Sequence, residues 1–145
     1  MKKLIQSLTI GYLILVYCTV GCDMGKRTVK VTIFHLGSNG YEKNVYDKCF
    51  WDEDQATAIK KSGLASVDGL YVSIPYSVVQ NLVINKTKDY IILGETDFVF
   101  DNTSQSTQSA GTRALIASHN TFIINSCSLK NHGSKRMWHW ELSGK

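Results

Sequence analysis

Short runs of alternating apolar and polar residues, separated by turn-forming residues, constrain the fold of this sequence more than any other feature. Val29–Phe34 is rich in β-branched residues and alternates with a period of two, which predicts a strand. Gly37–Gly40 contains Asn-Gly, the strongest short signal for a hairpin turn. Asn44–Trp51 is the expected return strand. The first predicted unit is therefore a β-hairpin.

Further strands are expected along the rest of the chain. Pro75 is the only proline, and because it cannot donate to a strand ladder it marks the end or the edge of a strand. The strands predicted after the hairpin are Leu70–Ile74, Tyr90–Leu93, Thr121–Asn125 and Met137–Leu142. Six or so short strands at near-regular spacing, without an internal repeat or a βαβ rhythm, predict a mainly β fold, a small barrel or sandwich.

Two polar segments interrupt this pattern. Asp52–Gln55 is predicted to be a solvated break between strands. Asp101–Gly111 consists mostly of Ser, Thr and Gln, and is either a surface loop or the start of a short helix that runs towards Ile116. For the helix, Thr103 or Ser104 is the expected N-cap. Because binding often resides on loops, both segments are candidate contact loops.

Residues 1–22 have the pattern of a secretory or lipoprotein signal. Met1–Lys3 is short and positively charged, and Leu4–Gly21 is a mostly apolar run of 18 residues without charge. A small residue then precedes Cys22, as in a bacterial lipobox. Cys22 is therefore the candidate for lipidation.

Two alternatives to a signal stay open for this segment. The chain could start at Met24, which would make residues 1–23 an upstream extension, or the apolar run could be a core helix. In each case residues 28–145 are predicted to form a single β-rich domain, which is large enough to bury an adequate core.

Cys49 and Cys127 are the two cysteines of the predicted domain. In an exported protein they could form one disulfide. The alternative is two buried free thiols that act as small apolar side chains. A metal site needs clustered ligands at short spacing, whereas these cysteines and the four His are scattered, so no metal site is predicted.

The sequence lacks the common catalytic and cofactor motifs. No Gly-rich phosphate loop follows a predicted strand, and neither H-E-x-x-H nor G-x-S-x-G occurs. Trp138 and Trp140 lie on one face of the last predicted strand, which indicates core or subunit interface rather than a platform for stacking a sugar or a base. We therefore predict no enzyme activity, catalytic residue, metal or cofactor.

The charge pattern does not indicate a nucleic-acid-binding protein. The net charge of +4 includes Lys2 and Lys3, and without them 14 basic residues face 12 acidic ones. No run of Lys and Arg is longer than two residues. Because a nucleic-acid-binding domain usually shows a basic stripe, no contact with nucleic acid is predicted.

Five stretches in a fixed order are characteristic when taken together. They are Phe50–Trp51, Lys61–Asp68, Tyr71–Tyr76, Asp89–Gly94 and Met137–Lys145. In this order they resemble a family of small, functionally uncharacterised proteins from tailed phages and prophages of Firmicutes. The resemblance covers Thr28–Lys145.

Genes of that family lie among head and head–tail connector genes, so the resemblance implies a minor virion or neck protein that acts by assembly. Its partners would be other virion proteins or further copies in a ring, which closes through heterologous contacts. With a start at Met24 it would reside in the virion or the host cytoplasm. The rival interpretation is an exported cell-surface lipoprotein of unknown binding role, which meets the membrane only if residues 1–22 are a signal or anchor.

Overall fold

A computed structural model of the protein describes residues 28–54, 57–60, 63–66 and 69–145. The signal at residues 1–22, the lipidation of Cys22 and the start at Met24 lie outside the described residues and stay predictions. Within the described part of the chain, no helix combines the length and the apolar character needed to cross a membrane.

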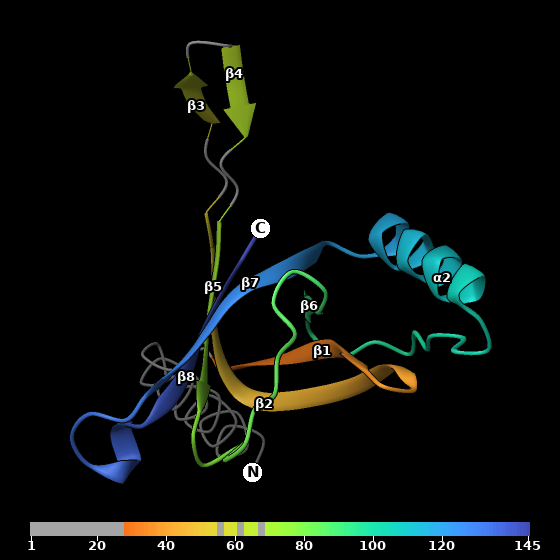
Figure 1. Ribbon diagram of the computed structural model, residues 1–145. Coiled ribbons are helices and arrows are strands. Elements are labelled where there is room, and N and C mark those ends of the chain that lie inside the picture. Colours follow the sequence, from red (N-terminus) through yellow and green to blue (C-terminus); the bar gives the residue numbers. More distant parts are fainter. Residues whose placement is uncertain (1–27, 55–56, 61–62, 67–68) are drawn as a thin grey trace, which may run out of the picture.

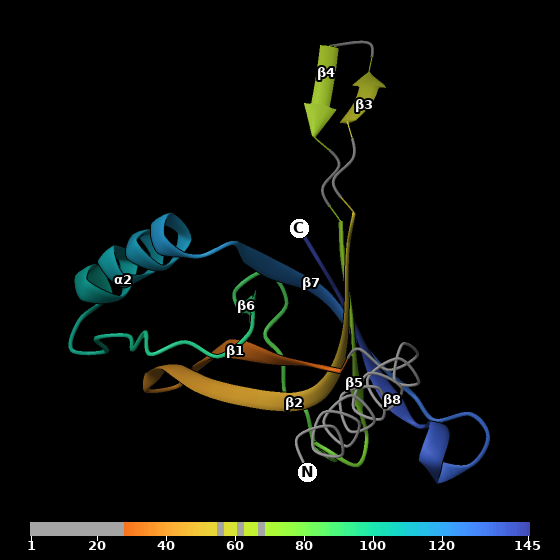
Figure 2. The ribbon, with the colours of Figure 1, turned by 180° about the vertical axis from the view of Figure 1, so that it is seen from behind.

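Six antiparallel strands form a closed barrel (Figures 1 and 2). These strands are β1 (Val29–Gly37), β2 (Gly40–Asp54), β5 (Gly69–Pro75), β6 (Tyr90–Leu93), β7 (Thr121–Lys130) and β8 (His139–Gly144). The other elements are β3 (Thr57–Lys60), β4 (Gly63–Ser66), the helix α2 (Gln105–Ser118) and the 3₁₀ turn η1 (Lys135–Met137). Around the barrel the order is β1-β2-β5-β8-β7-β6. The prediction of a small, mainly β barrel with one short helix is confirmed.

The predicted hairpin is formed by β1 and β2. Gly37 lies opposite Gly40, so that Ser38 and Asn39 make a two-residue turn. Gly40 has a φ of +115°, and a Cβ at this position would lie 2.3 Å from the Cγ atom of Asn102. Glycine is therefore required here both by the backbone conformation and by a close neighbour.

The predicted break at Asp52–Gln55 is wrong for Asp52–Asp54, which continue β2. Asp52 lies opposite Tyr71 and Asp54 opposite Gly69, so these acidic residues pair with the first residues of β5. In the same stretch β5 also pairs with β8, where Tyr71 lies opposite Ser143, and Asp52 and Asp54 are exposed on the outer face of these strands. Charged residues are therefore tolerated in the strand.

Apolar side chains fill the interior of the barrel. The almost completely buried ones are Val31, Ile33, Val72, Ile74, Ile91, Ile124 and Leu142. A second, smaller core lies on the opposite face of β1 and contains Phe34, Ile92, Phe100 and Leu115. Both faces of β1 are therefore covered, which makes this strand the centre of the fold.

The helical alternative for the Ser/Thr/Gln segment is the one the structure adopts, from Gln105 onwards. Ser104 is the N-cap, and its hydroxyl accepts a hydrogen bond from the backbone N–H of Thr107. Leu115 is the only side chain of α2 that is buried. At Gly111 the helix lies so close to Phe100 that an added Cβ would come within 2.9 Å of the ring.

Candidate functional site

A two-stranded arm projects from the barrel (Figures 1 and 2). It begins beyond Asp54 of β2 and Gly69 of β5, which lie opposite each other, and it ends in the β3–β4 hairpin. Within the described part of the chain, β3 and β4 pair only with each other. An isolated two-stranded hairpin is marginally stable at best in water.

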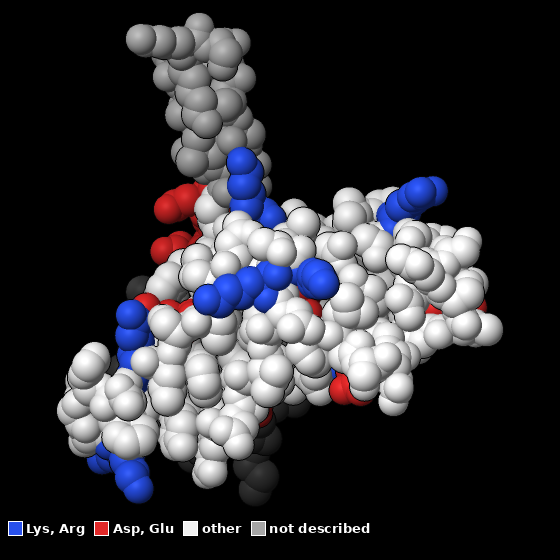
Figure 3. Space-filling view, in the orientation of Figure 1, with Lys and Arg blue, Asp and Glu red and all other residues white. Residues whose placement is uncertain are grey.

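Two aromatic side chains are exposed where the arm leaves the barrel. Phe50 is 51% exposed and Tyr71 is 38% exposed, and their rings meet edge to face with centroids 6.3 Å apart. Asp52 and Asp54 are exposed on the same stretch, and Figure 3 shows acidic side chains at this point. Aromatic residues are enriched at protein interfaces. The base of the arm therefore has the composition of a contact surface.

Next to this pair, polar side chains converge on Glu141, on the outer face of β5, β8 and β7. The Tyr71 hydroxyl donates to Glu141 Oε1 at 3.0 Å, Lys130 Nζ lies 3.3 Å from Oε2, and His139 Nε2 lies 3.3 Å from Oε1. Burial disfavours the charge on Glu141, but the bonds from Tyr71, His139 and Lys130 outweigh it and lower the pKa of this carboxyl. Glu141 is therefore a charged acceptor with three partners, which does not suit a general acid.

The shallow hollow around this cluster has a volume of about 300 Å³ and is also lined by Ser126, Ser128 and Ser143. The hydroxyls of Ser126 and Ser143 are hydrogen-bonded to each other at 2.6 Å. Burial and, to a smaller extent, the hydrogen bond to Glu141 raise the pKa of Tyr71, so the Tyr71 hydroxyl stays protonated. The hollow can therefore offer hydrogen bonds to a partner.

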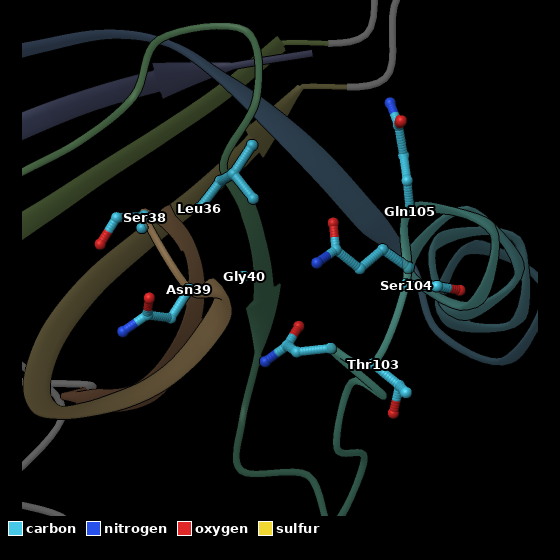
Figure 4. A pocket seen from close by; sticks show the side chains of 10 residues that line it. Leu36, Ser38, Asn39, Gly40, Thr103, Ser104 and Gln105 are labelled. Carbon is cyan, nitrogen blue, oxygen red and sulfur yellow. The ribbon is translucent and has the colours of Figure 1, made fainter.

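A second hollow, of about 460 Å³, lies between the β1–β2 turn and the start of α2 (Figure 4). Its polar side chains are uncharged amides and hydroxyls from Ser38, Asn39, Asn102, Thr103, Ser104, Gln105 and Gln108. In Figure 4, Asn39 and Gln105 come from opposite sides of the hollow. This site could accept a polar, uncharged surface, and its lining includes no titratable side chain.

Asp89 is a completely buried carboxylate that sequence reasoning missed. It accepts hydrogen bonds from the backbone N–H groups of Leu36 at 2.9 Å and Asn85 at 2.8 Å, and His35 Nδ1 lies 2.7 Å away. These contacts fasten the loop before β6 to the end of β1. Because two of its three partners are backbone N–H groups, Asp89 holds the fold together at this point.

The two tryptophans predicted as core or interface lie in different surroundings. Trp140 is half-buried and packs against the barrel core, and its indole N–H donates to the carbonyl of Val79 at 3.1 Å. Trp138 meets Tyr76 edge to face at 5.4 Å and donates to the carbonyl of Gly133 at 3.1 Å. Trp140 is therefore a core residue, and Trp138 holds two surface loops together.

Both cysteines of the domain are free thiols, so the disulfide considered from the sequence does not form in this structure. Cys49 is buried in the barrel core, and Cys127 is half-buried against the same core. Burial raises the pKa of the Cys49 thiol to about 12. Among the described residues, no group of three or more His, Cys, Asp or Glu is placed to hold a metal ion.

Residues 27–145 match the model of a family of unknown function, DUF6751. The chain belongs to this family. The match to DUF6751 includes the barrel, the arm and α2. No curated protein and no solved structure shows significant similarity to the chain. The DUF6751 family has no assigned function.

Proposed function

We propose that the protein is a non-enzymatic structural subunit that acts by assembling with neighbouring protein subunits, as a minor virion or head–tail connector component of a tailed phage or prophage. The observation that carries this proposal is the arm. Its β3–β4 tip stands away from the barrel and pairs with no other described strand. A neighbouring subunit would add strand pairing to this hairpin, which the other described strands do not provide.

The base of the arm supports the same function. Phe50 and Tyr71 expose aromatic surface beside a polar hollow, and this combination of an apolar centre with a polar rim is typical of protein interfaces. Glu141 and Asp89 are the two carboxylates that most resemble those of an enzyme site, and each is held by several hydrogen bonds. Their contacts stabilise the surface and the fold.

The phage setting rests on the resemblance of five stretches along Thr28–Lys145, and the geometry is compatible with it. A connector subunit needs a rigid small domain, projecting elements for its neighbours and no active site. The filled barrel and its arm meet these needs.

Trimming the arm tests the assembly function. Asp54 and Gly69 lie opposite each other, so residues 55–68 can be replaced by Asn-Gly, which favours a tight hairpin turn. We expect the trimmed protein to keep the unfolding free energy of the barrel. When it replaces the natural chain during phage production, we expect it to be missing from the particles. As a matched control, the turn residues Asn131 and Ser134, which lie away from the arm, are replaced by Ala. Normal incorporation of the trimmed chain would refute the role of the arm.

The rival function, an exported lipoprotein, is favoured by residues 1–22 alone. The intact mass of the protein from its natural gene separates the two. A chain that begins at a lipid-modified Cys22 supports the lipoprotein, whereas a chain that begins at Met24 or Gly25 supports the virion subunit.

A further inference from the structure

The tip of the β1–β2 hairpin has both of its outer edges closed by side chains. On β1, the N–H of Leu36 donates to Asp89, and its carbonyl accepts from the Asn85 side chain. On β2, the N–H of Tyr41 donates to Asn102 Oδ1 at 2.9 Å, and its carbonyl accepts from Asn102 Nδ2 at 3.0 Å. Leu36 and Tyr41 lie opposite each other, so at this pair the backbone groups of both strands point outwards.

The next outward positions of β2 are Lys43 and Val45. In an antiparallel ladder, backbone groups of alternate residues point to the same edge, so these two residues follow Tyr41. The pairing of β2 with β5 begins only at Phe50, and β1, on the opposite edge, is the one described strand that pairs with Lys43 and Val45. Both side chains are exposed, and the Lys43 ammonium donates to the Thr96 carbonyl at 3.1 Å, which leaves it further donors. Among the residues that the structure describes, the edge of β2 is therefore open at Lys43 and Val45.

We propose that this open edge pairs with the same edge of a second copy of the chain. The two β2 strands would run antiparallel about a two-fold axis at Val45, and would continue the β1–β2 sheet across the interface. Such an interface uses the same surface on both subunits. An exposed edge with unpaired N–H and C=O groups is a template for this kind of strand addition.

The charges on β2 match this register. With Val45 opposite the partner's Val45, Lys43 faces the partner's Asp47. By symmetry this pair occurs twice, so two pairs of opposite charge would flank the axis. Opposite charges directly across a ladder stabilise strand pairing, and like charges destabilise it.

The neighbouring registers are unfavourable. An axis at Lys43 would place the two Lys43 side chains opposite each other and would run into Asn102, which already occupies the edge at Tyr41. An axis at Asp47 would place two aspartates opposite each other. Lys48 has a φ of 55°, and this irregular position ends the straight part of the strand. Of the registers centred on Lys43, Val45 and Asp47, the one centred on Val45 fits between these limits.

This pairing is independent of the proposed function, because it does not use the arm or a virion partner. Its test therefore uses both the full chain and the chain with the trimmed arm, and measures the monomer–dimer equilibrium by sedimentation equilibrium. We expect a dimer of the natural sequence in both backgrounds. Lys43→Asp and Asp47→Lys should each weaken self-association at least about tenfold, because each puts two pairs of like charges across the axis.

An equimolar mixture of the two single variants gives the sharpest result. In a mixed dimer, the aspartate introduced in one copy would face the lysine introduced in the other, and the natural Lys43 and Asp47 that remain would face each other. Association should therefore return to about the natural strength. Lys86→Asp, the same charge change in a loop away from this edge, should leave the dimer unchanged. Thermal unfolding of each variant establishes that the barrel is intact.

A second variant tests the backbone pairing. Val45→Pro removes an N–H that points away from β1, so the barrel should remain folded while the dimer is lost. The proposal is overturned if the natural sequence stays monomeric up to about 1 mM. It is also overturned if neither charge reversal weakens the dimer, or if the mixture fails to recover association.

Discussion

The side chain of Asn102 pairs with the main chain of Tyr41 as a neighbouring strand would, by one accepted and one donated hydrogen bond of 2.9 and 3.0 Å. This pair fastens the segment between β6 and α2 to the β1–β2 hairpin. It also leaves room for Gly40 and for no larger residue.

Replacing Asn102 by Ala should lower the free energy of unfolding by about 1 kcal/mol, because one net hydrogen bond contributes on that scale at a partly exposed site. Chemical denaturation in urea measures this change. Asn131→Ala, in an exposed turn, is the matched control and should change stability by less than about 0.5 kcal/mol. Equal effects of the two substitutions would contradict the role of the Asn102 pair.

Asp89→Asn should be more damaging. The amide keeps an acceptor but turns an NH₂ group towards donors, which leaves buried groups without partners. We expect a loss of about 2–3 kcal/mol in the free energy of unfolding. Asp97→Asn, which removes the same charge at an exposed position, should have little effect. If both variants unfold at the same urea concentration, Asp89 does not hold the loop.

Gly111→Ala should reverse the usual effect of this substitution. In an exposed helix Ala is more stable than Gly by about 1 kcal/mol. At Gly111 the new Cβ would come within 2.9 Å of the Phe100 ring, so we expect a net loss of about 1 kcal/mol from overpacking. Ser106→Ala, on the exposed side of α2, should be neutral or slightly stabilising. A stabilising Gly111→Ala would show that α2 can move away from Phe100 at little cost.

Much of the fold could be predicted from local patterns, and what could not depends on contacts between distant residues. The alternation in Val29–Phe34, the Asn-Gly turn and the Ser104 cap are local signals, and they are present in the structure. The arm was missed because Asp52–Asp54 resembles a solvated break, and only the pairing with β5 shows that it is a strand. No pattern could reveal the burial of Asp89, since it lies in a polar run and is covered by β1.

The stability of the protein should fall as the pH rises above 9. Burial raises the pKa of the Cys49 thiol from 9.0 to about 12, and burial raises the pKa of Tyr41 from 10.0 to about 12. Between these values the unfolded chain loses its protons and the folded chain keeps them. The stabilisation that these two groups contribute is therefore complete below pH 9 and is lost as the pH approaches 12.

The free energy of unfolding, measured from pH 8 to pH 11, tests this prediction. Cys49→Ala removes one of the two groups, so its stability should fall less steeply than that of the natural chain. Cys127→Ala is a weaker perturbation at the same core, because Cys127 is only half-buried. An unchanged slope in Cys49→Ala would mean that the thiol does not contribute.

Phe50→Ser should separate assembly from folding. Phe50 is half exposed at the base of the arm, so the change in the free energy of unfolding should stay below about 1 kcal/mol. Incorporation into phage particles, quantified by mass spectrometry, should drop several-fold. Val99→Ser removes an apolar side chain that is 73% exposed and lies away from the arm, and it should leave incorporation unchanged. Equal incorporation of both variants would exclude Phe50 from the contact surface.

The most direct test of the assembly function is to quantify the protein in density-purified particles from a lysate of the strain that carries its gene. A structural subunit should co-purify with the capsid at a fixed number of copies per particle and should resist a salt wash. If the protein is missing from the particles and is recovered from the membrane fraction with a lipid on Cys22, the virion role is wrong and the protein is a surface lipoprotein.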